Sequence, residues 1–342
     1  MKKPTLKKRK QHKEEAPSRI TNDTVAEHRE RILAGGRRFK YPHQYTRHKL
    51  VINTIVIAVA AFIVMCVIGW WQLYPEQNTG TLFYRVTSVV PLPVAKVDGE
   101  QVRYSDYLLR YRGTIHWLQQ NGQLSNSKKQ LDYYKRTVLD GVERDAYAAK
   151  LAKEKNITVS AADVDEVIRA SLQASNGTIS QALYNSSILE SYGYSTSEYR
   201  TILRQSLLRQ KVAYAIDTQA LSTVNSVQTL LSKKKATLKS VAEKEDKSVQ
   251  YGGSGLVRRS NQDGGLTEAA SKLKVGQISD PIKSTTGDGY YIIQLDSLTS
   301  TELSYSYIKV PLTMFDTQFS ALASAHKIQE YITVPQADSV TK

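Results

Sequence analysis

Side chains that commonly carry chemistry are scarce in this 342-residue sequence and are unevenly distributed. Four of the six histidines lie within the first 49 residues, which leaves only His116 and His326 for the rest of the chain. The single cysteine, Cys66, excludes an internal disulfide framework and a zinc cluster built from cysteines. Histidine-dependent catalysis is therefore disfavoured, and we expect no cofactor and no metal.

Two serine motifs match hydrolase signatures only in part. Residues 252–256 have Leu256 where the nucleophile elbow of α/β hydrolases needs a second glycine. Ser232 and Lys235 satisfy Ser-x-x-Lys, but no Lys-Thr-Gly accompanies them, which favours a solvated helix face.

Tyrosine is unusually frequent, with 21 residues against 5 phenylalanines. Its ring offers apolar area and its hydroxyl a polar tip, so tyrosines suit loose contact with varied peptides. Half-buried structural tyrosines are the ordinary explanation for most of them.

The net charge of +15 is concentrated at the N-terminus. Residues 1–49 carry 15 basic and 5 acidic side chains, a net charge of +10, and the remainder carries only +5. This asymmetry argues against a nucleic-acid-binding domain that covers the molecule. Few apolar residues interrupt the basic runs, so the composition predicts a largely disordered tail that contacts anionic lipid.

An uncharged apolar segment follows the tail, from Val51 to Trp71. About 20 helical residues cross the ~30 Å hydrocarbon layer of a bilayer, and Trp70, Trp71 and Tyr74 suit the membrane–water interface. No Ala-x-Ala-like cleavage site follows, which predicts an uncleaved transmembrane helix. Basic residues flank its N-terminal side, whereas Arg85 is the first one after it, so the bulk of the chain should lie outside the cell membrane, with the N-terminus in the cytoplasm.

The residues beyond a short extended connector predict a hairpin followed by amphipathic helices. Asp98-Gly99 is a tight-turn dipeptide, and Ser105 is placed to cap the next helix. Apolar residues at spacings of three and four predict a helix over 128–155. Ser160 to Asp163 and Ser195 to Glu198 each have the pattern of a capping box at a helix start.

These segments resemble the N-terminal chaperone domain of SurA/PrsA-type extracytoplasmic foldases, a bacterial family. The resemblance covers most of residues 94–216 and includes Ile157–Ile168 and Ser197–Val212. It implies a domain that cradles unfolded polypeptide, for which Tyr107 and Tyr111 are candidate contacts.

A second group of segments begins near Ser226. Two short helices are expected at 227–231 and 238–243, a loop at 251–255, a helix from Leu266 and a β-branched, aromatic strand over 289–295. Residues 225–296 resemble a parvulin-type peptidyl-prolyl isomerase domain, most specifically in Leu273–Ile282 and Gly289–Ile293.

The resemblance also indicates that the usual catalytic groups have been replaced. Tyr291 stands at the position of the family's second histidine, Gln262 at its pocket methionine and Leu266 at its first pocket phenylalanine. Asp246 could occupy the place of the family's Cys or Asp. Lowering the ~20 kcal/mol rotation barrier of an X–Pro bond requires a dry proline pocket and a polar cluster, so these replacements predict little isomerase activity.

The family's first strand is not evident before Ser226. Residues 303–312 alternate like a strand and resemble the missing one, with Tyr307 at the place of its histidine. Pairing beside Tyr291 would give a permuted domain with two facing tyrosines, and a simple hairpin strand after Leu295 is the alternative. We expect residues 315–331 to form an amphipathic helix that docks on the chaperone-like domain.

The sequence thus predicts an α+β protein with a single transmembrane helix. The expected segments are a basic disordered cytoplasmic tail (1–49), the span (50–74), a connector (75–93), a helical chaperone-like domain with a small hairpin (94–216), a parvulin-like α+β domain with a small antiparallel sheet (217–300), a C-terminal strand and helix (301–334) and a tail (335–342).

The predicted function is a membrane-anchored folding factor for unfolded or newly exported polypeptides, with no specific nucleic-acid partner. One alternative is an active prolyl isomerase that uses Tyr291, Tyr307 and Asp246. The other is an envelope scaffold for one dedicated protein.

Overall fold

The computed structural model describes residues 21–125, 127–173, 179–233, 236–244 and 249–335, without the side chains of residues 35–47 and 173. The chain divides into two compact units, of which the first ends at Trp71 and the second is Gln72–Lys342. The predicted boundary near residue 216 lies inside the second unit, and the finer domain division stays a prediction.

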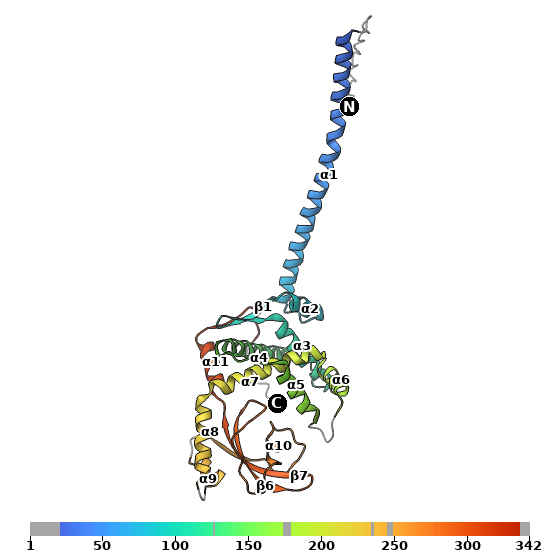
Figure 1. Ribbon diagram of the computed structural model, residues 1–342. Coiled ribbons are helices and arrows are strands. Elements are labelled where there is room, and N and C mark those ends of the chain that lie inside the picture. Colours follow the sequence, from blue (N-terminus) through green and yellow to red (C-terminus); the bar gives the residue numbers. More distant parts are fainter. Residues whose placement is uncertain (1–20, 126, 174–178, 234–235, 245–248, 336–342) are drawn as a thin grey trace, which may run out of the picture. The chain divides into compact units, whose positions relative to one another are not determined.

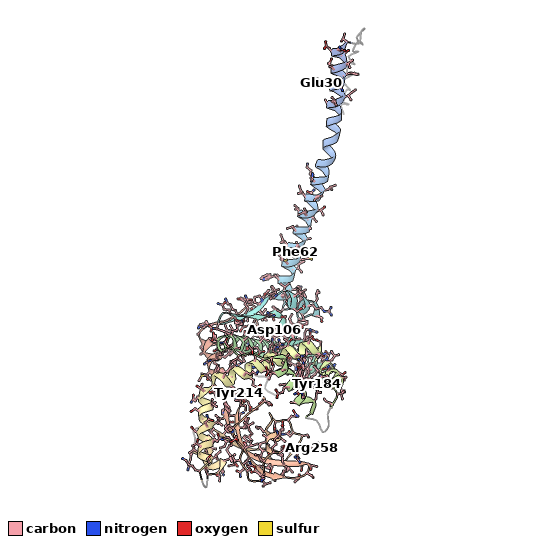
Figure 2. All side chains as sticks on the ribbon, in the orientation of Figure 1. Glu30, Phe62, Asp106, Tyr184, Tyr214 and Arg258 are labelled. Atoms are coloured by element: carbon pink, nitrogen blue, oxygen red, sulfur yellow. The ribbon has the colours of Figure 1, made fainter. Side chains whose placement is uncertain are left out.

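Helix α1, Asn22–Leu73, contains the apolar segment. Within the described residues, His48–Leu73 is one stretch that is long and apolar enough to cross a membrane, and none of its most apolar window is buried. Figure 2 shows Phe62 projecting from this helix. Residues 22–49, which the composition predicted to be disordered, are helical instead, because alanine, leucine, glutamate and arginine between residues 26 and 34 favour helix.

The expected extended connector is partly helical. Helix α2, Thr81–Val89, follows Gly80, and Phe83, Tyr84 and Thr87 turn one of its faces inward. The 3.6-residue spacing of these side chains outweighed the β-branched composition that suggested an extended segment.

The hairpin forms as predicted. Strands β1, Pro93–Val97, and β2, Glu100–Arg103, pair in antiparallel fashion. Asp98 and Gly99 have φ angles of 45° and 95°, the left-handed values that a type I′ turn requires.

The helices described between the hairpin and residue 216 are α3 (Tyr104–Gln120), α4 (Lys128–Lys155), α5 (Ala161–Gln173), α6 (Gln181–Tyr192) and α7 (Thr196–Ile216). Both predicted capping boxes are present, at Ser160 with Asp163 and at Ser195 with Glu198. Ser105 does not cap α3, because the helix already begins at Tyr104 and Arg103 occupies the N-cap.

The C-terminal half contains an antiparallel sheet with the strand order β3–β7–β6–β5. Its strands are β3 (Gln250–Gly253), β5 (Ile282–Lys283), β6 (Gly289–Leu298) and β7 (Glu302–Pro311), and β4 (Val257–Arg258) also pairs with β7. The loop expected at residues 251–255 is therefore largely strand. Its glycines suggested a loop, but Gly252 accommodates the Tyr307 side chain of β7.

Helices cover both faces of this sheet (Figure 1). One face packs against α8 (Thr218–Leu231) and α9 (Leu238–Ala242) through Ile292 and Ile308. The opposite face packs against α10 (Leu266–Ala270) through Ile293 and Leu303. Because side chains alternate along a strand, β6 is buried on both faces.

The C-terminal residues return to the helical part of the second unit. Helix α11, Met314–Ser324, packs Phe315 against Tyr147 of α4 with ring centroids 5.5 Å apart, as the predicted docking requires. The predicted helix to residue 331 is too long, because β8 (Ile328–Glu330) pairs with β1.

Candidate functional site

The β6–β7 hairpin brings the two predicted tyrosines together. Ile293 pairs with Tyr307 and Tyr291 with Lys309 in the antiparallel register. The ring centroids of Tyr291 and Tyr307 lie 5.6 Å apart at an interplanar angle of 58°. The predicted contact between residues 304–310 and 289–295 is therefore confirmed, and the two strands are also the consecutive arms of one hairpin.

The Tyr291 hydroxyl belongs to a hydrogen-bonded group that also contains Asp288 and Lys309. This hydroxyl donates a hydrogen bond to Asp288 Oδ2 at 2.6 Å, and Lys309 Nζ lies 2.6 Å from the same oxygen. Partial burial of Asp288 opposes its ionisation, but the bonds from Lys309 and Tyr291 outweigh burial and hold the pKa of its carboxyl well below the usual range. Burial and the Asp288 carboxylate raise the pKa of Tyr291, so its phenol is neutral at physiological pH.

Three tyrosine rings, those of Tyr291, Tyr305 and Tyr307, pack together on this face of the sheet. Tyr305 lies 6.3 Å from Tyr307 between ring centroids and donates a hydrogen bond to Asp263 at 2.6 Å. Tyr291 is 7% exposed and Tyr305 is 3% exposed. This face is consequently a packed core rather than an open pocket.

The other residues inferred from the parvulin resemblance have different surroundings. Leu266 is buried on α10 in the apolar cluster that contains Tyr291 and Tyr305. Gln262 is exposed on the loop before α10, and Asp246 lies outside the described residues. Sequence reasoning missed Tyr305, Asp288 and Lys309, although the alternation along residues 303–312 already places Tyr305, Tyr307 and Lys309 on one face of a strand.

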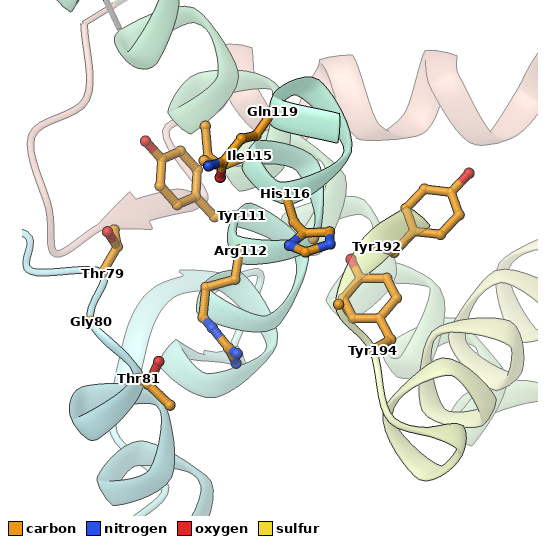
Figure 3. Close-up of a pocket in the computed structure, with 12 residues that line it drawn as sticks. Thr79, Gly80, Thr81, Tyr111, Arg112, Ile115, His116, Gln119, Tyr192 and Tyr194 are labelled. Carbon is orange, nitrogen blue, oxygen red and sulfur yellow. The ribbon is translucent and has the colours of Figure 1, made fainter. Parts of the chain in front are cut away.

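A groove of about 480 Å³ lies in the helical part, a volume within the usual range of ligand pockets. Helix α3 contributes Tyr111, Arg112 and His116, the start of α2 contributes Thr79–Thr81, and the α6–α7 junction contributes Tyr192 and Tyr194 (Figure 3). The groove thus combines aromatic rings with one guanidinium and several hydroxyls.

The aromatic wall of the groove is built by a short turn. Gly193 ends α6 with φ of 68°, and the rings of Tyr192 and Tyr194 stack with centroids 5.8 Å apart. The Tyr194 hydroxyl lies directly over Gly113 of α3, and a Cβ atom at residue 113 would collide with this hydroxyl. Tyr194 is therefore fixed, whereas Tyr192 is 37% exposed at the rim.

Two polar side chains of the groove, His116 and Arg112, contact neighbouring groups. His116 Nε2 lies 2.8 Å from the carbonyl oxygen of Glu190. The Arg112 guanidinium lies over the Tyr84 ring, 4.7 Å from its centroid. Burial of Glu198 opposes its ionisation, but hydrogen bonds from Ser195 and Tyr84 outweigh burial and lower its pKa, so a carboxylate accompanies Arg112.

The two tyrosines that the sequence proposed as peptide contacts have different surroundings. Tyr107 is completely buried, its hydroxyl has no hydrogen-bond partner within the described residues, and burial raises its pKa. The ring of Tyr107 packs parallel to that of Tyr111 and faces the core instead of solvent. Tyr111 is 5% exposed and lines the groove.

The described residues contain no cluster of three or more His, Cys, Asp or Glu side chains that could hold a metal ion. The candidate sites therefore offer aromatic contact, hydrogen bonds and the charge of Arg112. Tyrosine rings of this kind provide apolar area together with a polar hydroxyl.

Comparison with known proteins agrees with the helical part of the fold. A family model described as the SurA-like N-terminal domain matches residues 43–213, half of the chain, and this range includes the groove. No curated protein and no solved structure matches the chain. The family match ends before the sheet, so the parvulin resemblance of residues 225–296 stays a prediction. A domain of this kind indicates a chaperone-like folding factor, and the chain belongs to the family of proteins that carry a SurA-like N-terminal domain.

Proposed function

We propose that this protein is a membrane-anchored extracytoplasmic folding factor that binds unfolded or newly exported polypeptides. The observation that carries the proposal is the groove beside α3, which lies within the SurA-like domain and displays tyrosine rings around an arginine. An unfolded chain would place apolar and aromatic side chains against Tyr192, the tyrosine that is exposed at the rim. Its backbone carbonyls would accept hydrogen bonds from Arg112 and the threonine hydroxyls.

The contacts expected in this groove are few and adaptable. Tyrosine contributes large contact area with little loss of side-chain entropy, and it accepts many partner shapes. A groove of this volume takes only a few side chains of a client at a time. Weak, exchanging contacts of this kind suit a holdase, which must release its client for folding.

An aggregation assay tests the groove. The full chain, reconstituted in lipid nanodiscs, should reduce light scattering by a chemically unfolded, aggregation-prone polypeptide. Tyr192→Ala should weaken that protection by about tenfold in effective concentration, as expected when an aromatic anchor worth ~1.4 kcal/mol is truncated. Tyr251→Ala is the matched control, because Tyr251 is an exposed tyrosine on β3, outside the groove.

Equal protection by both variants and the unchanged protein would contradict a role for the groove. Co-purification separates the scaffold alternative from the chaperone. Many substoichiometric clients support the folding factor, whereas one stoichiometric protein supports a scaffold.

The proposed topology places the N-terminus in the cytoplasm and the bulk of the chain outside the cell membrane. It is supported by the candidate span His48–Leu73 and by basic residues such as Arg47 and Lys49 at its N-terminal end. Protease added to intact cells should digest the second unit and spare the N-terminus. Digestion of the lysine-rich N-terminus alone would contradict this topology.

Prolyl isomerisation is the second candidate function, favoured by the contact between Tyr291 and Tyr307. We propose that the sheet lacks this activity, because tyrosine rings fill the face and the Tyr291 hydroxyl is engaged with Asp288. The full chain should not accelerate a proline-limited refolding reaction. Acceleration that Tyr291→Phe abolishes would favour the enzyme instead.

A further inference from the structure

Helix α2 presents an apolar stripe to solvent. Its inward side chains are Phe83, Tyr84 and Thr87, and Thr87 is only 1% exposed. The opposite side bears the α2 stripe, which we define as Leu82, Val86, Val89 and Val90, with exposed fractions of 68%, 44%, 82% and 46%. The first three members stand at positions i, i+4 and i+7, so they form one continuous line on the helix.

The start of α2 is held near the end of the candidate span. The backbone N–H of Asn78 donates to the carbonyl oxygen of Gln72 at 2.8 Å, and Asn78 Nδ2 donates to Gln72 Oε1 at 2.9 Å. Gln72 is the penultimate residue of His48–Leu73. Thr81 follows Asn78 by three residues, which extend by at most about 10 Å.

The last two residues of the candidate span, Gln72 and Leu73, belong to the second unit. Leu73, the last residue of α1, is 3% exposed and belongs to the core of Gln72–Lys342. The Tyr74 hydroxyl donates a hydrogen bond to the carbonyl oxygen of Pro93 at 2.8 Å. The chain therefore enters the folded unit at the residue where the apolar span ends.

The charge of α2 suits a lipid surface. The helix contains no acidic residue, and the exposed Arg85 lies between Leu82 and Val86 along the stripe. Interfacial helices combine an apolar face with basic residues, which contact the headgroups of anionic lipids.

We propose that the α2 stripe inserts into the headgroup region of the bilayer that α1 crosses, a proposal that rests on the proposed membrane anchoring. The residues just before the stripe, Thr79–Thr81, line the groove beside α3. Lipid contact by α2 thus sets one rim of the groove at the membrane surface, where an exported polypeptide first appears.

Fluorescence quenching tests the lipid contact in the full chain. The native Cys66 is replaced in Cys66→Ser, and an environment-sensitive fluorophore is attached through Val89→Cys after reconstitution in vesicles that contain anionic lipid. Lipids with quenchers near the headgroup should remove most of the emission and shift the remainder to the blue. Leu183→Cys in the same background is the matched control, because Leu183 is an apolar residue, 55% exposed, on α6.

A label on the native Cys66 separates this proposal from membrane anchoring. Quenching of Cys66 by lipids with deep acyl-chain quenchers, together with no more quenching at Val89 than at Leu183, would overturn the α2 proposal and leave the anchor intact. A label at Cys66 that no lipid quencher reaches would contradict the anchor itself. A blue shift at Val89 without lipid quenching would mean that protein covers the stripe, which also overturns the proposal.

Discussion

The ring of Tyr307 on β7 packs directly over Gly252 on β3, its partner in the antiparallel register. A Cβ at residue 252 would lie 2.6 Å from the ring, closer than side chains can approach. Gly252, which suggested a loop in the sequence, therefore leaves the space that the Tyr307 ring occupies in the sheet.

Gly252→Ala should destabilise the protein because the new methyl group must displace a packed ring. Overpacking of this kind costs roughly 1–3 kcal/mol. Chemical denaturation of the full chain measures the loss. Gly253→Ala is the control, since its Cβ would meet only the Tyr305 carbonyl oxygen, at 3.8 Å, and it should have a much smaller effect. Equal losses in the two variants would show that Tyr307 does not occupy this position.

Gly113→Ala and Gly141→Ala should change stability in opposite directions. Both glycines lie within helices, but a Cβ at 113 collides with the Tyr194 hydroxyl, whereas a Cβ at 141 has no heavy atom within 4 Å. Alanine at 141 should stabilise α4 by about 0.5–1 kcal/mol through helix propensity. Alanine at 113 should lower the thermal midpoint and also weaken client binding, because it displaces the aromatic wall of the groove. A stable Gly113→Ala variant with normal aggregation protection would contradict this account of the groove.

Asp217→Ala should be strongly destabilising because one buried carboxylate serves two helices. Its Oδ1 accepts from the backbone N–H of Ala220 at the start of α8, at 2.9 Å. Its Oδ2 accepts from Thr313 and Met314 at the start of α11, at 2.7 Å and 3.0 Å. Leaving these donors without an acceptor should cost roughly 3 kcal/mol in unfolding free energy.

Asp217→Asn should cost less, since the amide oxygen still accepts from one helix start. The control is Asp280→Ala, because Asp280 is exposed and accepts a hydrogen bond from the Gln228 side chain rather than from a helix start. A loss for Asp217→Ala no larger than for the control would rule out this bridging role.

Glu143 should make the protein less stable as pH rises between about 5 and 8. Burial and the nearby Glu330 carboxylate raise the pKa of Glu143 from its ordinary value of 4.5 to about 8, and they outweigh the opposing effect of the Arg136 guanidinium, 3.6 Å from Glu143 Oε2. The folded state therefore binds more protons than the unfolded state in this window. The stabilisation is complete below the unfolded-state pKa of 4.5 and is lost as pH rises towards the folded-state pKa of about 8. The free energy of unfolding falls in this window with a slope of roughly 1.4 kcal/mol per pH unit.

The free energy of unfolding is measured at several pH values for the unchanged protein and for Glu143→Gln. The difference between the two profiles isolates the contribution of Glu143 from those of Asp140, Glu330 and the other charged neighbours. The variant should show a flatter pH profile and should exceed the unchanged protein in stability near pH 8. Parallel profiles would contradict the protonated state of Glu143. Among the described residues its Oε1 has no hydrogen-bond partner, which agrees with the unfavourable burial of its charge.

Much of the local structure was predictable because its signals lie within a few residues of one another. The Asp98-Gly99 turn, the capping boxes at Ser160 and Ser195 and the α4 boundaries depend on side chains one to four positions apart. The apolar span depends only on composition and length. Residues 303–312 were predicted as a strand because their side chains alternate, and the parvulin resemblance suggested its place beside Tyr291.

Long-range pairing was decided only by the tertiary structure. Strand β8 pairs with β1 more than 200 residues earlier, and β3 joins the sheet only because β7 offers it an edge. Nothing within residues 250–253 or 328–330 specifies a partner. Their short, glycine-containing or polar sequences therefore suggested a loop in one case and a helix in the other.

The sequence by itself determined the apolar span, the Asp98-Gly99 turn and the capping boxes at Ser160 and Ser195, because local composition and spacing specify each of them. The packing of the whole chain decided which tyrosine of α3 lines a groove. Tyr107 and Tyr111 are one helical turn apart, yet Tyr107 is completely buried, whereas Tyr111 lines the groove that Tyr192 and Tyr194 complete from the α6–α7 junction. Accessibility depends on every element that packs around a side chain, and no local pattern encodes it.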